Sequence, residues 1–205
     1  RRNPTGSGPE ISAQARVAAC FSNQTFGKKA GQPDDMKSIE IPDAKSFDGR
    51  PFPPVVAPEN CPDIRIWVAA HRVALLERMA GEGAVLVRGL PVTNAETFDT
   101  FVEAVGLPAF PYKDSLSNAH RISFTERVFS ANEAPAELPI FLHHEMAQTP
   151  LPPSALFFFC EIPADEGGAT PLCRSDILWE ELCRADASFA ESCERKGLRY
   201  TNVMA

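Results

Sequence analysis

The sequence lacks the features that mark several large classes of protein. No apolar run approaches the roughly 20 residues that a membrane-spanning helix requires. No apolar segment follows the basic pair at the N-terminus, as a secretory signal would need. Basic residues are also few: the net charge is −7, whereas contacts with backbone phosphates demand a basic surface. We therefore expect neither a membrane nor a nucleic acid as a partner.

The six cysteines show no sign of a disulfide framework or a zinc site. No Cys-x-x-Cys pair occurs, and the remaining spacing has no zinc signature. In a chain of 205 residues without a secretory signal, we interpret the cysteines as reduced, small core residues. This interpretation favours a reducing compartment, most simply the cytoplasm. The cysteines are Cys20, Cys61, Cys160, Cys173, Cys183 and Cys193.

The N-terminal quarter predicts little regular structure. Residues 1–57 are rich in Pro, Gly, Ser and Asp and show weak periodicity, which is typical of irregular chain. We expect residues 1–49 to be an irregular lead-in and residues 50–205 to form one domain. No internal repeat is visible.

Residues 62–90 predict a helix followed by a strand. Apolar side chains recur at helical spacing, and Gly81 and Gly83 should end the helix. AVLVRGL (84–90) then predicts a strand. The apolar stripe of the helix consists of Ile64, Val68, His71, Leu75 and Met79. Because His71 lies on this stripe, we interpret it as a packed residue rather than a metal ligand.

A second helix is predicted directly after this strand. Thr93-x-x-Glu96 has the form of a capping box at its start, and Gly106 should end it. The apolar face of this helix is formed by Phe98, Phe101, Val102 and Val105.

After residue 110 the chain reads as short strands separated by turn residues, followed by a helical tail. Strands at this spacing favour a sandwich or a barrel. In the tail, Trp179 and Leu182 should face inward, and Asp186 should cap a last helix. The predicted strands are residues 121–131, 139–146, 155–162 and 169–173.

The segment FLHHEMAQTP (141–150) carries the candidate chemistry. Successive side chains of a strand point to opposite faces, so a strand here would put His143 and Glu145 on one face and His144 on the other. An imidazole beside a carboxylate is two thirds of a 2-His-1-carboxylate triad, which holds Fe(II) and leaves positions open for a substrate and O₂. Taken alone, His-x-Glu is a weak signal, and a structural histidine beside a solvated glutamate remains the alternative.

The residues that follow strengthen the iron interpretation. The segment HHEM (143–146) is followed by Pro150, by FFFC (157–160), by Pro163-Ala164 and by GGATP (167–171). This pattern resembles the taurine dioxygenase (TauD/TfdA) family of Fe(II)- and 2-oxoglutarate-dependent oxygenases, and looks most similar to its SyrP-like branch. RGLPV (88–92) and YTNV (200–203) also resemble family patterns, so the resemblance runs from about residue 50 to the C-terminus.

The resemblance implies a fold, a reaction and roles for three residues. The fold would be α+β, a partial double-stranded β-helix (jelly roll, clavaminate synthase-like) with flanking helices. His143 and Glu145 would be the Fe(II) ligands, and Thr170 would donate a hydrogen bond to a carboxylate of 2-oxoglutarate, after a tight turn at Gly167 and Gly168. The reaction would be O₂-dependent hydroxylation of a small molecule.

The sequence departs from the family pattern at two places. His144 stands where this branch usually has Asn, and Cys173-Arg174-Ser175-Asp176 has its charges exchanged relative to the usual small-Asp-Ser-Arg. We expect the first change to matter little, since His144 would face away from the metal. Retention of Glu145 disfavours halogenation, because related halogenases lack this carboxylate.

The family's second iron histidine and its 2-oxoglutarate arginine come much later than the first motif, and no histidine follows His144. We therefore interpret the chain as the N-terminal part of a dioxygenase domain and expect the polypeptide alone to be inactive. His120, beside Arg121 in a polar turn, is interpreted as solvated.

Two other classes of function compete with an oxygenase. One is a truncated, catalytically inactive family member that acts as a binding module or remnant. The other is a zinc-dependent, cupin-like isomerase, which HHE followed by GGAT fits poorly. The substrate and the oligomeric state are not encoded in any recognisable motif.

Overall fold

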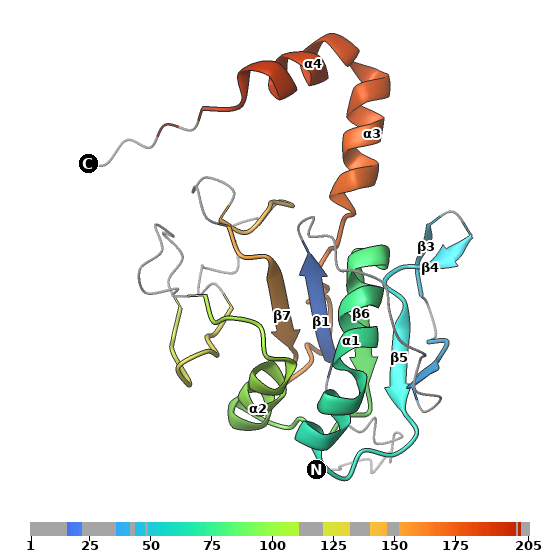
Figure 1. Ribbon diagram of the computed structural model, residues 1–205, viewed down its shortest axis with the longest axis vertical. Coiled ribbons are helices and arrows are strands. Elements are labelled where there is room, and N and C mark those ends of the chain that lie inside the picture. The colour runs from blue at the N-terminus through green and yellow to red at the C-terminus, as the bar shows by residue number, and fades with distance from the viewer. Residues whose placement is uncertain are drawn as a thin grey trace, which may run out of the picture.

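A computed structural model describes residues 16–21, 36–41, 44–47, 49–110, 121–131, 140–146, 152–199 and 201. It combines helices and strands: α1 and α2 cover one face of a sheet, and α3 and α4 protrude beyond it (Figure 1). Within these ranges, no helix is both long enough and apolar enough to cross a membrane. The α+β class predicted from the sequence is confirmed at this level.

The main sheet has five strands in the order β2-β5-β6-β1-β7. β5 and β6 run parallel, and the other neighbouring pairs are antiparallel. A second sheet pairs β3 with β4. The strands are β1 (Arg16–Phe21), β2 (Met36–Ser38), β3 (Ser46–Phe47), β4 (Arg50–Pro51), β5 (Val55–Pro58), β6 (Ala84–Arg88) and β7 (Ala155–Phe159).

The N-terminal segment holds more regular structure than its composition predicts. β1 lies between β6 and β7, with Ala19 opposite both Val85 and Phe157. The sequence of β1, RVAACF, is apolar after its first residue, so it suits an inner position in a sheet. The strand is short and lies between segments that contain Pro and Gly, so the sequence pattern did not predict it. The domain boundary between residues 49 and 50 stays a prediction.

Helix α1 (Ile64–Glu82) forms as its apolar stripe predicts, but Gly81 lies inside it. Asp63 caps its start by accepting a hydrogen bond from the Ile66 amide at 3.0 Å. The helix ends at Gly83, whose φ of 82° lies in the left-handed region that glycine adopts without strain. His71 is packed, as predicted: it is 1% exposed, its ring stacks on Trp67, and its Nδ1 lies 2.7 Å from the Trp67 carbonyl oxygen.

Helix α2 (Ala95–Val105) begins one residue later than predicted, because Asn94 rather than Thr93 is the N-cap. The Asn94 side chain accepts from the Thr97 amide at 2.9 Å, and the Thr97 hydroxyl accepts from the Asn94 amide at 3.1 Å. The helix ends at Gly106, as predicted. The Arg72 guanidinium lies against this end, where the helix dipole favours a cation.

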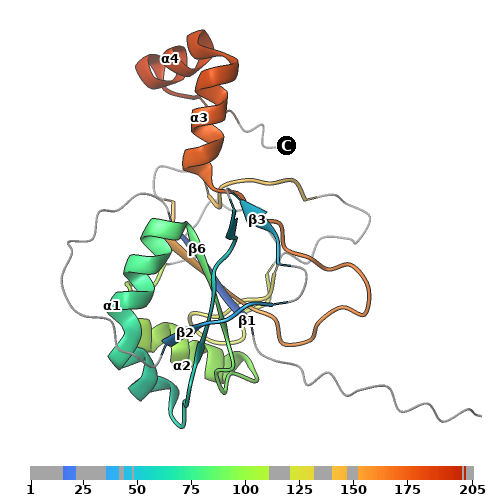
Figure 2. The same ribbon diagram turned by 90° about the vertical axis from the view of Figure 1, so that its right-hand side faces the viewer.

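The core lies between these two helices and the sheet, as the view from the side shows (Figure 2). Two aromatic pairs join α2 to β7: Phe98 with Phe159, at a ring-centroid distance of 5.4 Å, and Phe101 with Phe157, at 6.3 Å. Phe158, between them, points to the opposite face and is 42% exposed. In the described residues, the phenylalanines of β7 therefore pack against a helix on one face of the sheet only.

Three of the predicted strands do not form in the described residues. Residues 121–131 fold back on themselves, with a single bridge between Ser123 and Phe129, because the Thr125 hydroxyl accepts from the Arg127 and Val128 amides and tightens a turn. Residues 140–146 and 169–173 are irregular. The predicted strand at 155–162 is confirmed as β7, although it ends at Phe159.

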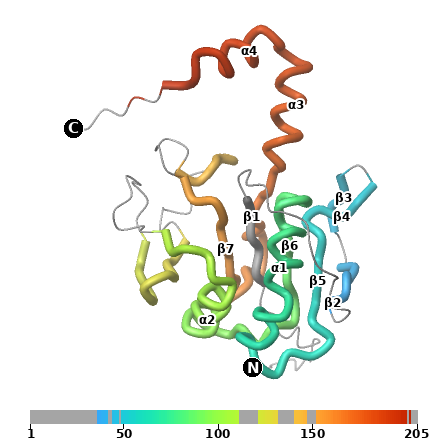
Figure 3. The backbone as a smooth tube through the Cα atoms, in the orientation of Figure 1, coloured from blue at the N-terminus to red at the C-terminus, as the bar shows by residue number. Residues whose placement is uncertain are grey.

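The helical tail is confirmed as α3 (Ser175–Ala185) and α4 (Ala187–Lys196), with Asp186 capping α4. The predicted inward face is wrong for Trp179, which is 36% exposed, because both helices extend away from the sheet (Figure 3). Leu182 is half-buried. The part of the chain that the structure describes shows a five-stranded sheet with helices on one face and does not by itself show a jelly roll.

Replacing Phe101 with alanine should lower the free energy of unfolding by about 3–5 kcal/mol, because the side chain is 2% exposed between α2 and β7. The matched control is Phe47→Ala: this phenylalanine is 52% exposed on β3, and its loss should cost less than about 0.5 kcal/mol. Urea unfolding followed by circular dichroism measures both. Equal effects would contradict this placement of the core.

Candidate functional site

The predicted metal ligands lie on residues 140–146, an irregular segment that ends in a turn at Glu145 and Met146. The Nδ1 atom of His143 lies 2.7 Å from the carbonyl oxygen of Phe141. Since a carbonyl oxygen only accepts, Nδ1 donates in this contact, and in a neutral imidazole it carries the one ring proton. Nε2 then presents its lone pair, which is the form that binds a metal.

Glu145 has a different neighbour at each carboxylate oxygen. Oε2 lies 3.7 Å from His143 Nε2, and Oε1 lies 3.3 Å from Nη2 of Arg121. An imidazole lone pair and a carboxylate oxygen repel each other at this separation unless a proton or a cation lies between them. The distance suits either a protonated His143 paired with Glu145 or a cation held between the two atoms.

Met146 occupies the turn that ends this segment. Its φ of 60° is in the left-handed region, the only such non-glycine residue in the described part of the chain, and its side chain is 4% exposed. This conformation costs roughly 1–2 kcal/mol and persists because the side chain is buried. His143 and Glu145 lie two residues apart just before Met146, in a segment that forms no strand in the described residues.

The donor set suits a ferrous ion. One imidazole nitrogen and one carboxylate oxygen are the ligand types of non-haem Fe(II) sites. Two ligands of one metal lie roughly 3 to 3.5 Å apart when each bond is about 2.1 Å long, so the observed 3.7 Å needs only a small adjustment. Among the described residues, no group of three or more His, Cys, Asp and Glu side chains is placed to hold a metal.

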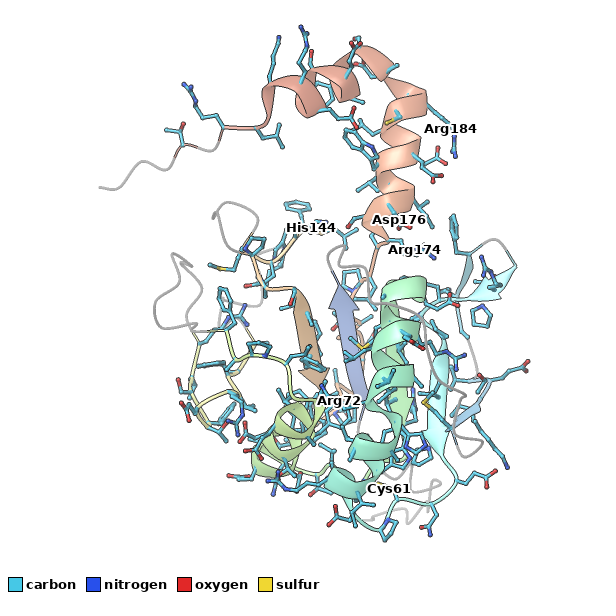
Figure 4. The ribbon with its side chains drawn as sticks, viewed as in Figure 1. Cys61, Arg72, His144, Arg174, Asp176 and Arg184 are labelled. Carbon is cyan, nitrogen blue, oxygen red and sulfur yellow. The ribbon has the colours of Figure 1, made fainter. Side chains whose placement is uncertain are left out.

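His144, which the strand pattern placed on the face opposite His143 and Glu145, is exposed. Its Nε2 lies 2.5 Å from the hydroxyl of Ser175, the first residue of α3. Figure 4 shows His144 at the level where α3 begins, close to Arg174 and Asp176. The segment with the candidate ligands is therefore joined to the start of α3.

Arg174 and Asp176, whose charges are exchanged relative to the family pattern, form an ion pair at the start of α3. Arg174 donates two hydrogen bonds to Asp176, at 3.1 and 2.5 Å. These bonds hold the pKa of the Asp176 carboxyl below its usual value and raise the pKa of Arg174. The Arg174 Cγ also lies 3.1 Å from the position that a Cβ on Gly83 would take. Arg174 thus covers the C-terminal end of α1, where a cation is favourable.

Thr170 is exposed on the irregular segment between β7 and α3. The turn before it forms as expected: Gly167 and Gly168 have φ of 71° and 67°, and a Cβ on Gly168 would lie 2.7 Å from that of Ala164. No hydrogen bond joins Thr170 to His143 or Glu145 in the residues described. The structure thus brings His143 and Glu145 together, whereas Thr170 is not joined to this pair in the described residues. His120 lies outside the described residues.

Sequence reasoning missed Arg121 and Ser175. Arg121 is 24 residues before Glu145, and Ser175 is 31 residues after His144. Neither residue type is unusual in a loop or at a helix start, so no local pattern indicates its partner. The side chains of Arg121 and Glu145 are 20% exposed each, which is similar to the Arg127–Asp99 pair and well below the Arg184–Glu180 pair.

Replacing Arg174 with methionine should raise the pKa of Asp176 toward its ordinary value of about 3.9. Because the folded-state pKa is lowered, the pair stabilises the fold above about pH 4 and this contribution is lost as pH falls through the lowered pKa. NMR titration of the Asp176 carboxyl measures the shift. Arg184→Met, which removes an exposed arginine elsewhere on α3, is the control and should leave the Asp176 pKa unchanged.

The chain is similar to known proteins over most of its length. The taurine catabolism dioxygenase TauD, TfdA family matches residues 48–204. A clavaminate synthase-like protein of Arabidopsis thaliana is 38% identical over 173 residues, which cover 80% of this chain and 52% of that protein. The dapdiamide synthesis protein DdaC of Enterobacter agglomerans is 25% identical over 124 residues, which cover 60% of this chain and 36% of that protein.

The chain spans about half of the length of the first of these curated relatives and less of the second. The family match includes both β7 and the segments that carry His143, Glu145 and Thr170, and it extends over most of the chain. The chain belongs to the taurine catabolism dioxygenase TauD, TfdA family.

Proposed function

We propose that this chain supplies two protein ligands, His143 and Glu145, to the Fe(II) centre of a 2-oxoglutarate-dependent dioxygenase that hydroxylates a small molecule. The observation that carries the proposal is the 3.7 Å separation between His143 Nε2 and Glu145 Oε2, with the Nδ1 proton already committed to the Phe141 carbonyl. Membership of the TauD, TfdA family supports an oxygenase reaction.

The chain's own residues would bind and orient. Fe(II) with 2-oxoglutarate and O₂ would supply the oxidising power for hydroxylation. His143 offers a fixed nitrogen lone pair, and Glu145 offers an anionic oxygen on the same side. Thr170, which follows Gly167 and Gly168, would donate a hydrogen bond from its hydroxyl to a carboxylate of 2-oxoglutarate.

We propose a partial jelly roll for the domain as a whole. The helices α1 and α2 cover one face of the main sheet, and the opposite face, which includes Phe158, carries no helix in the described residues. That face would form one wall of the double-stranded β-helix. The family match supports this architecture.

A catalytically inactive binding protein is the second candidate. It is favoured by one observation: within the described residues, His143 and Glu145 do not form part of a larger cluster of metal-binding side chains. Such a protein would bind a metal or 2-oxoglutarate without consuming O₂. Turnover of 2-oxoglutarate by the complete gene product separates the two candidates.

Replacing His143 with alanine should abolish Fe(II)-dependent consumption of 2-oxoglutarate by the complete gene product, a loss of at least about 100-fold, because a direct ligand matters more than an outer partner. His144→Ala is the matched control, since the neighbouring ring contacts Ser175 instead of Glu145. Succinate formation under O₂ measures both. Equal turnover in wild type and His143→Ala would contradict the site, and no turnover in wild type would favour the binding protein.

Replacing Thr170 with valine should raise the KM for 2-oxoglutarate by about 10-fold or more, because a hydrogen bond to a charged group is lost while the shape is kept. The value of kcat should change less. Thr170→Ser retains the hydroxyl and should restore most of the affinity. An unchanged KM in Thr170→Val would show that Thr170 does not contact 2-oxoglutarate.

A further inference from the structure

Within the described residues, Arg121 contacts Glu145 on one side and Ser130 on the other. Its Nη2 lies 3.3 Å from Glu145 Oε1, and its Nη1 donates to the carbonyl oxygen of Ser130 at 3.3 Å. Ser130 is held in turn, because its amide donates to the Ile122 carbonyl oxygen at 2.8 Å. The guanidinium therefore spans from a folded-back segment, residues 121–131, to the segment with the candidate ligands.

The Arg121–Glu145 pair is better shielded than the exposed ion pairs of the chain. Each side chain is 20% exposed, whereas Arg184 and Glu180 are 63% and 66% exposed. Exposed pairs are screened by water and rarely hold one geometry. Partial burial and the second bond to Ser130 restrict the Arg121 side chain, so that it can direct one particular oxygen of Glu145.

We propose that Arg121 is a positioning residue that makes Glu145 a monodentate ligand. It occupies Oε1 and leaves Oε2 alone facing His143 Nε2. This inference rests on the proposed function, since it assumes that His143 and Glu145 bind the metal. Its consequence is an additional open position at the metal, because a carboxylate that bound through both oxygens would occupy two. Two co-substrates, 2-oxoglutarate and O₂, need such positions.

A purely structural role for Arg121 predicts a different effect of its removal on Glu145. A structural ion pair would affect the stability of the fold but not which oxygens of Glu145 bind. The effect on metal affinity alone does not separate the two roles, because loss of Arg121 removes both an orienting hydrogen bond and a repelling positive charge. The binding mode of the Glu145 carboxylate is therefore the quantity to measure.

Infrared difference spectroscopy on addition of Co(II) to the complete protein measures this mode, because the separation between the two carboxylate stretches is wide for monodentate and narrow for bidentate binding. Glu145→Gln identifies the bands of Glu145. We expect a wide separation in wild type, a narrow one in Arg121→Met and Arg121→Gln, and substantial recovery in Arg121→Lys, which keeps the cation. The control Arg184→Met should match wild type.

The outcomes separate this inference from the proposed function. If Co(II) changes no Glu145 band in wild type, or binds as tightly to His143→Ala, then the metal-site assignment fails. If Co(II) binding depends on His143 but wild type already shows the narrow separation, or if both neutral variants keep the wide one, then Arg121 does not set the binding mode. Thermal unfolding without metal checks that each variant folds, and Arg121→Gln, compared with Arg121→Lys, decides the question even if Arg121→Met does not fold.

Discussion

The packing of α1 and α2 against one face of the sheet is the interaction on which the rest of this structure depends. Phe98 and Phe101 of α2 contact alternate phenylalanines of β7, and burying such side chains stabilises a fold by about 1.5–3 kcal/mol each. These contacts fix β7, which lies along the chain between the two segments that carry the candidate site residues. Residues 140–146 precede it, and the Gly167–Gly168 turn and Thr170 follow it.

The site itself is held mainly by polar contacts. The side chain of His143 is 58% exposed, and its orientation comes from the Phe141 carbonyl oxygen. Glu145 is oriented by Arg121, and His144 by Ser175. In the described part of this segment, Met146 is the one fully buried side chain, and its backbone is left-handed. Hydrogen bonds have directional preferences that apolar contacts lack, which suits a site that must present single atoms.

The elements that the sequence predicted well are those whose signals are local. α1, α2 and the Asp186 cap are specified by apolar spacing and by side chains within four residues of the helix ends. The strand at 139–146 failed because alternation holds only where a neighbouring strand accepts the backbone hydrogen bonds, and because Met146 leaves the extended region. The predicted proximity of His143 and Glu145 holds nevertheless, since Nε2 and Oε2 lie 3.7 Å apart. Arg121 could not be found, since its partner is distant in sequence.

The start of α3 joins parts of the molecule that are far apart along the chain. Ser175 contacts His144, and the adjacent Arg174 covers Gly83 at the end of α1. A helix that protrudes from a domain would ordinarily fray independently of it. Here fraying of the first turn of α3 would remove the hydrogen bond that orients His144 and the arginine that covers the end of α1. The orientation of His144, next to the candidate ligands, is therefore linked to the order of a helix that contributes none of them.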